Sequence, residues 1–324
     1  MNEHLKSMIN DTTFNEKIEE VKETHISYIF LTKNYAYKIK KDAKFSFLDY
    51  STLEKREFYC KEELRINKIL SPDMYLKVSA LSMKGNNLAL SNEGMPLEYT
   101  VVMKRIPEKY IMKNLIDNNE IKDDTIEEIA LKILCFHKKV RVDLEGKFGS
   151  IDTFKKNVMD NFKDLELFVG DLFSNNEFNK LIGKNLDFMN NNKNLFQKRV
   201  KEGKICETHG DLHSGNIFIA TDKIYIFDAI EFNPVINTTD VTAEIAFLCM
   251  DLEFLGRDDL SKIFSNKYIS ESGDKDMVAL LSFYKCYRAC VRAKVNGYRA
   301  SVDSTAKELT KKYFYLALKY AEEL

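Results

Sequence analysis

The sequence predicts an α+β fold made of two lobes: a small β-rich lobe at residues 1–105 and a larger, mainly helical lobe at residues 106–324. The length of 324 residues exceeds the usual size of one compact domain, which favours two separate cores. Strand-like segments fill much of the sequence before Pro107, whereas apolar residues recur at helical spacing after it.

The β-rich lobe opens with a predicted hairpin. Residues 26–31 and 35–40 are rich in β-branched and aromatic residues and are joined by the polar turn Thr32-Lys33-Asn34. Next, Ser51-Thr-Leu-Glu54 has the form of a capping box and predicts a charged amphipathic helix that ends at Leu70, before Ser71-Pro72. A further strand is expected at residues 99–103.

The second lobe is predicted to be helical because residues 124–139 place apolar side chains on one helical face. Helix-like segments continue to about Val200, and residues 240–255 and 277–298 show the same spacing. The lobe therefore contains several long helices.

Composition limits the classes of partner. A formal charge of −1, with 31% charged residues, gives no overall attraction to nucleic acid or to an anionic membrane, so we expect a small-molecule partner. Residues 1–14 lack the apolar core of a signal peptide, and no run of eighteen apolar residues occurs. The six cysteines have no paired spacing and indicate reduced thiols, so we expect a cytoplasmic protein. The oligomeric state stays open.

One segment carries most of the chemical information. Residues 209–216 read His-Gly-Asp-Leu-His-Ser-Gly-Asn and predict a phosphoryl-transfer centre. Such a centre needs a carboxylate beside the acceptor hydroxyl, together with a carboxamide and a second carboxylate that hold Mg²⁺ against nucleotide phosphates. Asp211 is the candidate base, and Asn216 and Asp228 are the candidate metal ligands because they follow it by five and seventeen residues.

The sequence between these residues explains how they would meet. Short strands at residues 217–219 and 224–227, joined by a polar turn at residues 220–223, would return the segment 226–231 to the mouth of the loop. His209 is expected to orient the loop rather than act as the base.

A transition-metal site formed by His209, Asp211 and His213, with Cys206 upstream, is an alternative interpretation. Its spacing matches no standard zinc pattern.

In the first lobe, a lysine must contact the nucleotide phosphates and be held by a carboxylate. Lys38 is the preferred candidate, but Lys40 lies on the same face of the strand, so the period of two cannot separate them. Glu63 is the preferred partner, with Glu62 as the alternative. The sequence contains neither a glycine-rich phosphate loop nor a P-loop motif.

Together these residues resemble the aminoglycoside-phosphotransferase-like family of the protein-kinase-like fold, whose loop has the form HGDxxxxN followed by a strand and an aspartate. The likeness runs from about Val21 to the helix at residues 287–294. It is similar in particular to a bacterial branch that is often fused to a P-loop ATPase domain, and the segments that carry it are residues 23–31, 37–41, 47–56, 226–233 and 246–253. The resemblance implies a bilobal fold with ATP or GTP in the cleft and Mg²⁺ beneath it. The 324 residues hold no second ATPase domain.

The resemblance also implies roles for residues of the second lobe. Asp240 would brace the 209–216 loop from the start of the next helix, or serve as its N-cap. Arg288 and Arg292 stand four residues apart on one helical face and would bind substrate or phosphate. An ion pair with an acidic residue inside the lobe (Glu244, Asp251 or Glu253) is the more ordinary interpretation of both arginines and the one that we favour.

The leading hypothesis is an ATP- or GTP-dependent, Mg²⁺-dependent O-phosphotransferase that acts on a hydroxyl of a small molecule. Glu231 would face the acceptor pocket, and further acceptor contacts are expected between Tyr110 and Lys201. A nucleotide-sensing module without turnover and a transferase that modifies a protein are the alternatives. The resemblance does not establish an aminoglycoside acceptor, since fold does not fix function.

Overall fold

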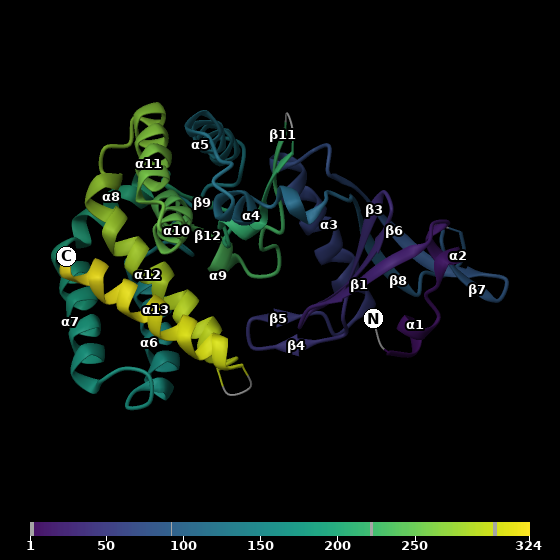
Figure 1. Cartoon of the computed structure of the whole chain (residues 1–324), viewed down its shortest axis with the longest axis horizontal. Coiled ribbons are helices and arrows are strands. Elements are labelled where there is room, and N and C mark those ends of the chain that lie inside the picture. Colours follow the sequence, from purple (N-terminus) through teal and green to yellow (C-terminus); the bar gives the residue numbers. More distant parts are fainter. Residues whose placement is uncertain (1–2, 92, 221–222, 301–302) are drawn as a thin grey trace. The chain divides into compact units, whose positions relative to one another are not determined.

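The chain folds into two compact units in a computed structural model (Figure 1). Met1–Asn118 and Gly215–Pro234 form the first unit, and Asn119–Ser214 and Val235–Leu324 form the second. This division differs from the expected boundary after residue 105, because the chain after Ser214 joins the β-rich unit. The residues that the structure describes are 3–91, 93–220, 223–300 and 303–324.

The first unit is built on a six-stranded antiparallel sheet with the order β1-β2-β3-β8-β6-β7. The predicted hairpin is present as β2 and β3, in which Phe30 pairs with Tyr37. The predicted strand at residues 99–103 is the middle of β8. The sheet strands are β1 (Ile18–Glu23), β2 (Ser27–Thr32), β3 (Tyr35–Lys40), β6 (Tyr75–Lys84), β7 (Asn87–Leu90) and β8 (Glu98–Lys104), and a short hairpin of β4 (Lys44–Phe45) and β5 (Leu48–Asp49) follows β3.

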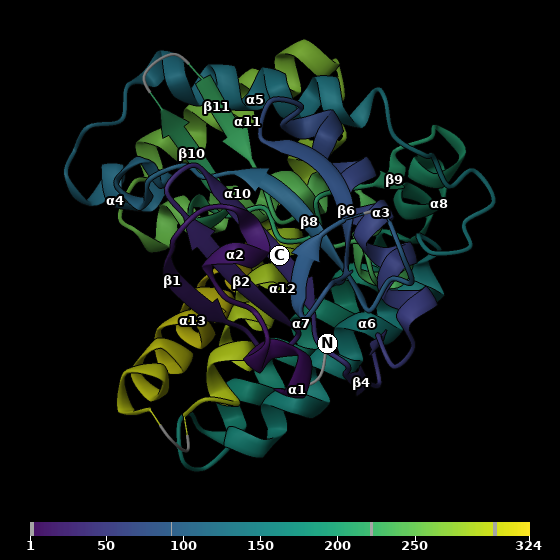
Figure 2. The ribbon, with the colours of Figure 1, turned by 90° about the vertical axis from the view of Figure 1, so that its right-hand side faces the viewer.

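One face of this sheet is covered by the amino-terminal helices α1 (Glu3–Ser7) and α2 (Asp11–Phe14), which lie in front of the strands in Figure 2. The ring of Phe14 stacks on Tyr37 with a centroid distance of 4.0 Å. Alternate residues of a strand point to opposite faces, so Lys38 and Lys40 point away from these helices.

Helix α3 (Leu53–Leu70) belongs to the opposite face, where Cys60 packs with residues of β6 and β8. Its N-cap is Thr52, whose hydroxyl accepts a hydrogen bond from the Lys55 amide, so the cap lies one residue after the Ser51 of the predicted capping box. Arg56 fixes the helix to β8, because its Nε donates to both carboxylate oxygens of Glu98, at 3.0 and 2.9 Å.

The strands predicted after the 209–216 loop are present as the hairpin β10 (Ile217–Ala220) and β11 (Lys223–Ile226). Two of the expected turn residues, 221–222, lie outside the described residues. The hairpin belongs to the first unit because Phe218 forms a bridge with Ile111, and the Ser71 hydroxyl bonds to the backbone of Ile226 at 2.8 Å.

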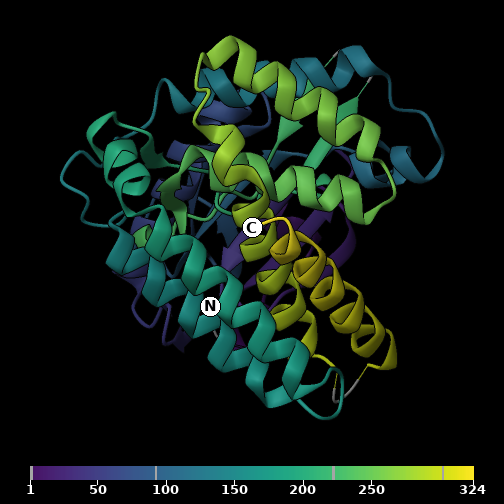
Figure 3. The ribbon, with the colours of Figure 1, turned by 90° about the vertical axis from the view of Figure 1, so that its left-hand side faces the viewer.

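The second unit is mainly helical, as the sequence predicts. Its largest apolar cluster joins α6, α7, α10, α12 and α13, and the helices of this cluster lie side by side in Figure 3. Helix α10 is buried on all sides from Val241 to Leu252, which is typical of a core helix. The longer helices are α5 (Asp123–His137), α6 (Ile151–Leu165), α7 (Asn175–Asn191), α8 (Lys193–Lys201), α10 (Val241–Phe254), α11 (Asp258–Ser272), α12 (Met277–Gly297) and α13 (Ser304–Glu322).

Smaller elements complete the chain. Strands β9 (Ile205–Glu207) and β12 (Thr238–Asp240) pair in the second unit, where α9 (Pro234–Asn237) leads into β12. In the first unit, α4 (Met112–Asp117) follows β8. Within the described residues, no helix has the length and apolar character that crossing a membrane requires. All six cysteines are free thiols, in agreement with their spacing.

Candidate active site

The predicted lysine–glutamate pair is present in the first unit. Lys38 of β3 lies with its Nζ 2.8 Å from Oε1 of Glu63 on α3, and the glutamate is fully buried. Burial opposes the charge on Lys38, but Asp228 and Glu63 outweigh it and raise the pKa of the lysine. The preferred glutamate is therefore the one that faces the strand, whereas Glu62 bonds to Arg65 on its own helix.

Lys40, which the sequence left as the alternative, contacts the same glutamate. Its Nζ lies 2.7 Å from Oε2 of Glu63 and 3.2 Å from the hydroxyl of Tyr50. It also forms an ion pair with Glu231, and Tyr50 donates a hydrogen bond to that carboxylate at 2.6 Å. The expectation that Glu231 faces an acceptor is not what the structure shows, because this buried carboxylate is paired with Lys40.

Asp228 follows the β10–β11 hairpin at its open end. The Phe227 amide donates to the Asn216 carbonyl at 3.0 Å, so the ladder continues one step past β10 and β11 and places Asn216 beside the start of the 226–231 segment. The Asp228 backbone has φ of +64°, a left-handed conformation that aspartate tolerates better than most residues. This turn directs its carboxylate to Lys38, with which it forms an ion pair.

Side chains of α3 and β6 hold this turn in place. The Asp228 amide donates to the Tyr75 hydroxyl at 3.0 Å, and the Ala229 amide donates to the Asn67 carbonyl oxygen at 2.9 Å. Because the side chain of Asp228 is still 51% exposed, its carboxylate is accessible to a ligand. Asp228 and Asn216 supply carboxylate and carboxamide oxygens, the ligand types that Mg²⁺ prefers, so these residues fit that metal.

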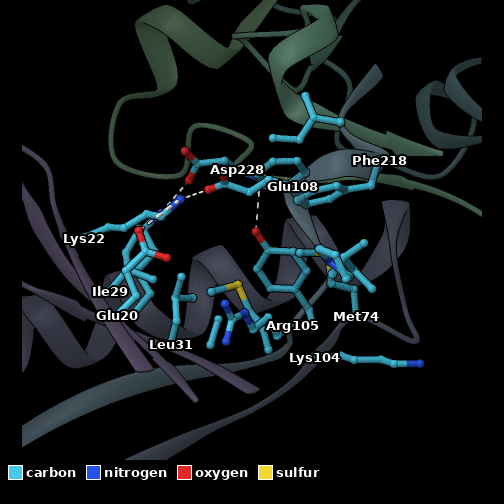
Figure 4. Close-up of a pocket in the computed structure, with 18 of the residues that line it drawn as sticks. Glu20, Lys22, Ile29, Leu31, Met74, Lys104, Arg105, Glu108, Phe218 and Asp228 are labelled. Carbon is cyan, nitrogen blue, oxygen red and sulfur yellow. Dashed lines mark hydrogen bonds and ion pairs between the residues drawn. The ribbon is translucent and has the colours of Figure 1, made fainter. Parts of the chain in front are cut away.

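A pocket of about 570 Å³ opens beside Asp228, and all of its lining residues belong to the first unit. Figure 4 shows Ile29 and Leu31 of β2 facing the pocket opposite Phe218 of β10. The ring of Phe218 stacks on Phe227 with a centroid distance of 4.6 Å. Apolar side chains form much of the wall, and charged side chains, among them Lys22, Lys38 and Asp228, line the rest. A nucleotide requires both, apolar surface for its base and charged groups for its phosphates and metal.

The 209–214 part of the loop belongs to the second unit. There the Asp211 carboxylate lies 3.5 Å from Nε2 of His213 and is 39% exposed. Partial burial opposes ionisation of Asp211, but the charges of His213 and Arg292 outweigh it and hold the pKa of the carboxyl below its usual range. The same pairing outweighs burial for His213 and raises the pKa of its imidazole.

His209 has the position expected of an orienting residue. Its ring is buried, and its Nδ1 accepts a hydrogen bond from the Asp211 amide at 3.2 Å. Its own amide donates to both carboxylate oxygens of Glu244 at 2.9 Å. Glu244 also lies 3.1 Å from Nε2 of His137, so a buried carboxylate links the loop to α5.

Glu244 and Asp251 of α10 position the loop through contacts that were not expected from the sequence. Asp251 accepts a hydrogen bond from the Ser214 amide at 2.8 Å, at the other end of the loop. The two acidic residues are seven positions apart, or about two helical turns, and therefore share one face. Two carboxylates on one face of a helix that is apolar over most of its length were the available signal.

Within the part of the chain that the structure describes, the contacts of Asp240 are with α8 and with the start of its own helix rather than with the 209–216 loop. Its carboxylate pairs with Arg199 of α8 and accepts a hydrogen bond from the Thr242 amide at 2.7 Å, so the N-cap alternative holds. Asp240 ends β12, where it pairs with Ile205 of β9, and both of its carboxylate oxygens bond to Arg199. Arg199 also binds Asp274 at 2.9 Å.

The two arginines of α12 have different surroundings. Arg288 is buried and donates to the carbonyl oxygens of Gly210, at 3.1 Å, and Ala243, at 3.0 Å. It therefore supports the loop and does not present its guanidinium to a substrate. Arg292 lies close enough to Asp211 for its charge to lower that pKa, and its Nε is buried without a hydrogen-bond partner in the part of the chain that the structure describes.

The transition-metal alternative receives no support. Among the described residues, no three His, Cys, Asp or Glu side chains are grouped so that they would hold a metal ion.

Comparison with known proteins places this geometry in context. No protein-family model matches the sequence. Over 290 residues the chain is 31% identical to an uncharacterized protein of Mycobacterium tuberculosis, and the match covers 88% of this chain and 56% of that protein. The chain thus spans about half the length of the curated relatives it matches.

Solved structures give the fold. The GDP and kanamycin complex of APH(2″)-IIia matches with a TM-score of 0.58 at 12% identity, over 99% of both chains. Choline kinase from Cryptosporidium parvum matches with a TM-score of 0.61 at 12% identity, over 98% of this chain and 92% of that one. The α+β prediction is confirmed, and the chain has the protein-kinase-like fold that aminoglycoside phosphotransferases and choline kinases share.

Proposed function

We propose that this protein is a Mg²⁺-dependent phosphotransferase that moves the terminal phosphoryl group of ATP or GTP to a hydroxyl of a small molecule. The observation that carries the proposal is the position of Lys38, which contacts both Glu63 and Asp228 at the edge of an apolar pocket. In phosphoryl transfer a lysine held by a glutamate aligns phosphates, and an aspartate beside it holds the metal.

Each residue then has a defined task. Lys38 binds nucleotide phosphate oxygens, and Asn216 and Asp228 provide the oxygen ligands for Mg²⁺. The metal, when bound, supplies positive charge that offsets the charge of the phosphates. The pocket walls, including Phe218, bind the base by apolar contact.

Asp211 is the proposed catalytic residue toward the acceptor. Its lowered pKa keeps it ionised near neutral pH, so it is able to orient the acceptor hydroxyl and accept its proton as the oxygen attacks phosphorus. His209 accepts a hydrogen bond from the amide of this residue, Glu244 accepts one from the amide of His209, and Arg288 donates to the carbonyl of Gly210. These contacts hold the backbone around Asp211 and thereby restrict the orientation of its carboxylate.

The similarity to an aminoglycoside enzyme and to a choline kinase supports a hydroxylated small molecule as the acceptor class. Each of these two proteins shares 12% sequence identity with this chain, so the support for this acceptor class comes through the fold alone.

The first test is calorimetry of the purified protein with Mg·ATP and Mg·GTP. Wild type is expected to bind at least one of them, and Asp228→Ala is expected to lose the Mg²⁺-dependent part of the affinity. Lys41→Met is the matched control, because this lysine pairs with the half-exposed Glu23 of β1 and does not line the pocket. Wild type that binds neither nucleotide would overturn the proposal.

The second test measures transfer over a panel of sugars, amino alcohols and aminoglycosides, with product mass to identify the group transferred. Asp211→Asn is expected to reduce transfer about 10²- to 10⁴-fold, the usual contribution of a general base, and to leave nucleotide affinity within about threefold. An Asp211→Asn variant with full activity contradicts the assignment. A product heavier by a nucleotidyl group, or a modified protein, would replace the proposed reaction.

A further inference from the structure

The strand that carries Lys38 presents a second buried lysine to the same glutamate. Glu63 uses its two oxygens separately, with Oε1 2.8 Å from Lys38 and Oε2 2.7 Å from Lys40. Lysine–glutamate pairing for phosphate binding needs one lysine, so the contact of Lys40 lies outside the roles assigned above.

Lys40 is no surface lysine that happens to be near. Its side chain is 1% exposed, and Glu63 and Glu231 are both buried beside it. Burying a lysine is unfavourable unless its charge is compensated, and here the two carboxylates outweigh burial and raise the pKa of Lys40. Tyr50 completes the group with hydrogen bonds to Lys40 and Glu231.

The second carboxylate connects this cluster to the metal-binding segment. Glu231 lies three residues after Asp228, so the segment 226–231 is attached to β3 twice, through Lys38 at Asp228 and through Lys40 at Glu231. Glu63 joins both lysines to α3. The two attachments differ in accessibility, because the side chain of Asp228 is 51% exposed and that of Glu231 only 5%.

This difference matters during the proposed reaction, on which the inference rests. To bind Mg·ATP, Lys38 must turn toward phosphate, and Asp228 must turn toward the metal. Their ion pair is then lost. Lys40 and Glu231 are too buried to take part in that exchange, so their pair persists and still holds Glu63 and the segment.

We propose that Lys40 and Glu231 are positioning residues that keep α3 and the segment 226–231 assembled before nucleotide binds and while Lys38 changes partners. The nucleotide site of the first unit is then preformed, and α3 needs no ligand to reach its place. Disruption of the pair should loosen the segment and weaken the metal site, although neither residue touches nucleotide.

The test compares Lys40→Met and Glu231→Gln with Lys41→Met, the lysine next in sequence. The first measurement is amide hydrogen exchange of the segment 226–231 in the nucleotide-free protein. We expect the amides of this segment to exchange at least tenfold faster in Lys40→Met and Glu231→Gln than in wild type. In the control they should exchange at the wild-type rate. Glu231→Gln keeps the Lys40–Glu63 pair, so it remains informative if Lys40→Met does not fold.

The second measurement is the Mg²⁺ concentration that gives half-maximal ATP binding. It is expected to rise at least tenfold in both variants, with ATP affinity in the absence of Mg²⁺ unchanged. The double variant should be no worse than Lys40→Met alone, since Lys40→Met already removes the pair with Glu231. Folded variants with wild-type exchange and wild-type Mg²⁺ dependence would overturn the inference.

The two measurements distinguish a failure of this inference from a failure of the proposed function. Hydrogen exchange requires no nucleotide, so faster exchange in Glu231→Gln supports the positioning role even if wild type binds no ATP. Wild type that binds Mg·ATP, combined with unchanged exchange in both variants, removes the positioning role and leaves the proposed phosphotransfer intact.

Discussion

Replacing Glu244 by glutamine is expected to slow transfer strongly while nucleotide binding stays nearly unchanged. In the folded chain both carboxylate oxygens of Glu244 lie 2.9 Å from the His209 amide nitrogen, and one lies 3.1 Å from Nε2 of His137. A carboxamide replaces one of these acceptors with a donor. Even with its oxygen at the position of Oε2, which both neighbours contact, glutamine loses the Oε1 contact with the His209 amide and replaces charge-assisted hydrogen bonds by weaker neutral ones.

The size of the effect follows from these contacts. A hydrogen bond to a charged group contributes about 1.5–3 kcal/mol, so the free energy of unfolding of the second unit should fall by about that amount. For a unit of this size, 1 kcal/mol lowers Tm by about 2–4 °C, which predicts a loss of about 3–12 °C. Because His209 also accepts from the Asp211 amide, displacing it by a fraction of an ångström should reduce kcat about 10- to 100-fold.

The assay combines kcat for the best acceptor, Tm and calorimetric affinity for Mg·ATP. Glu253→Gln is the matched control, because this residue is on the same helix and pairs with Lys285 at 3.1 Å and with Tyr320. Both variants should lose stability and keep nucleotide affinity within about threefold. Only Glu244→Gln should lose kcat, and a kcat equal to that of Glu253→Gln would refute the reasoning.

Three further outcomes are expected. Arg199→Met leaves two buried carboxylates without their arginine and should lower the free energy of unfolding, measured by thermal unfolding, by about 3–5 kcal/mol. Lys201→Met, on the exposed face of α8, should lower it by less than about 0.5 kcal/mol. Equal losses in the two variants would contradict the buried network. His213 has a raised pKa, so its pairing stabilises the folded chain fully below pH 6.5 and is lost as pH rises through the folded pKa. Urea unfolding at several pH values should therefore show a deficit for His213→Gln that shrinks at alkaline pH and is absent in the exposed control His25→Gln. Phe218→Ala removes an aromatic side chain from the pocket wall and should weaken Mg·ATP binding about tenfold, as measured by calorimetry. An unchanged affinity would contradict the assignment of this wall to the base.

Much of the first unit could be predicted from local sequence. The turn between β2 and β3 and the end of α3 at Leu70 follow from residue preferences that act over a few positions. The approach of the segment 226–231 to Asn216 also follows from spacing, since a short hairpin returns the chain to its start. The choice between Lys38 and Lys40 was beyond such reasoning, because both lie on one face of the strand, and the structure shows that both contact the glutamate.

By itself, the sequence predicted the α+β class, the main strands and helices, and the residues on which the proposed phosphoryl transfer depends. Only the tertiary structure decided which buried charges are partners: Asp240 with Arg199, and Glu231 with Lys40 across 191 residues of sequence. A buried charge must be compensated, but its partner is set by which elements pack side by side. The periodicity of the sequence determines on which face of a helix or strand a side chain lies. The packing of elements that are distant in sequence determines which residues that face contacts.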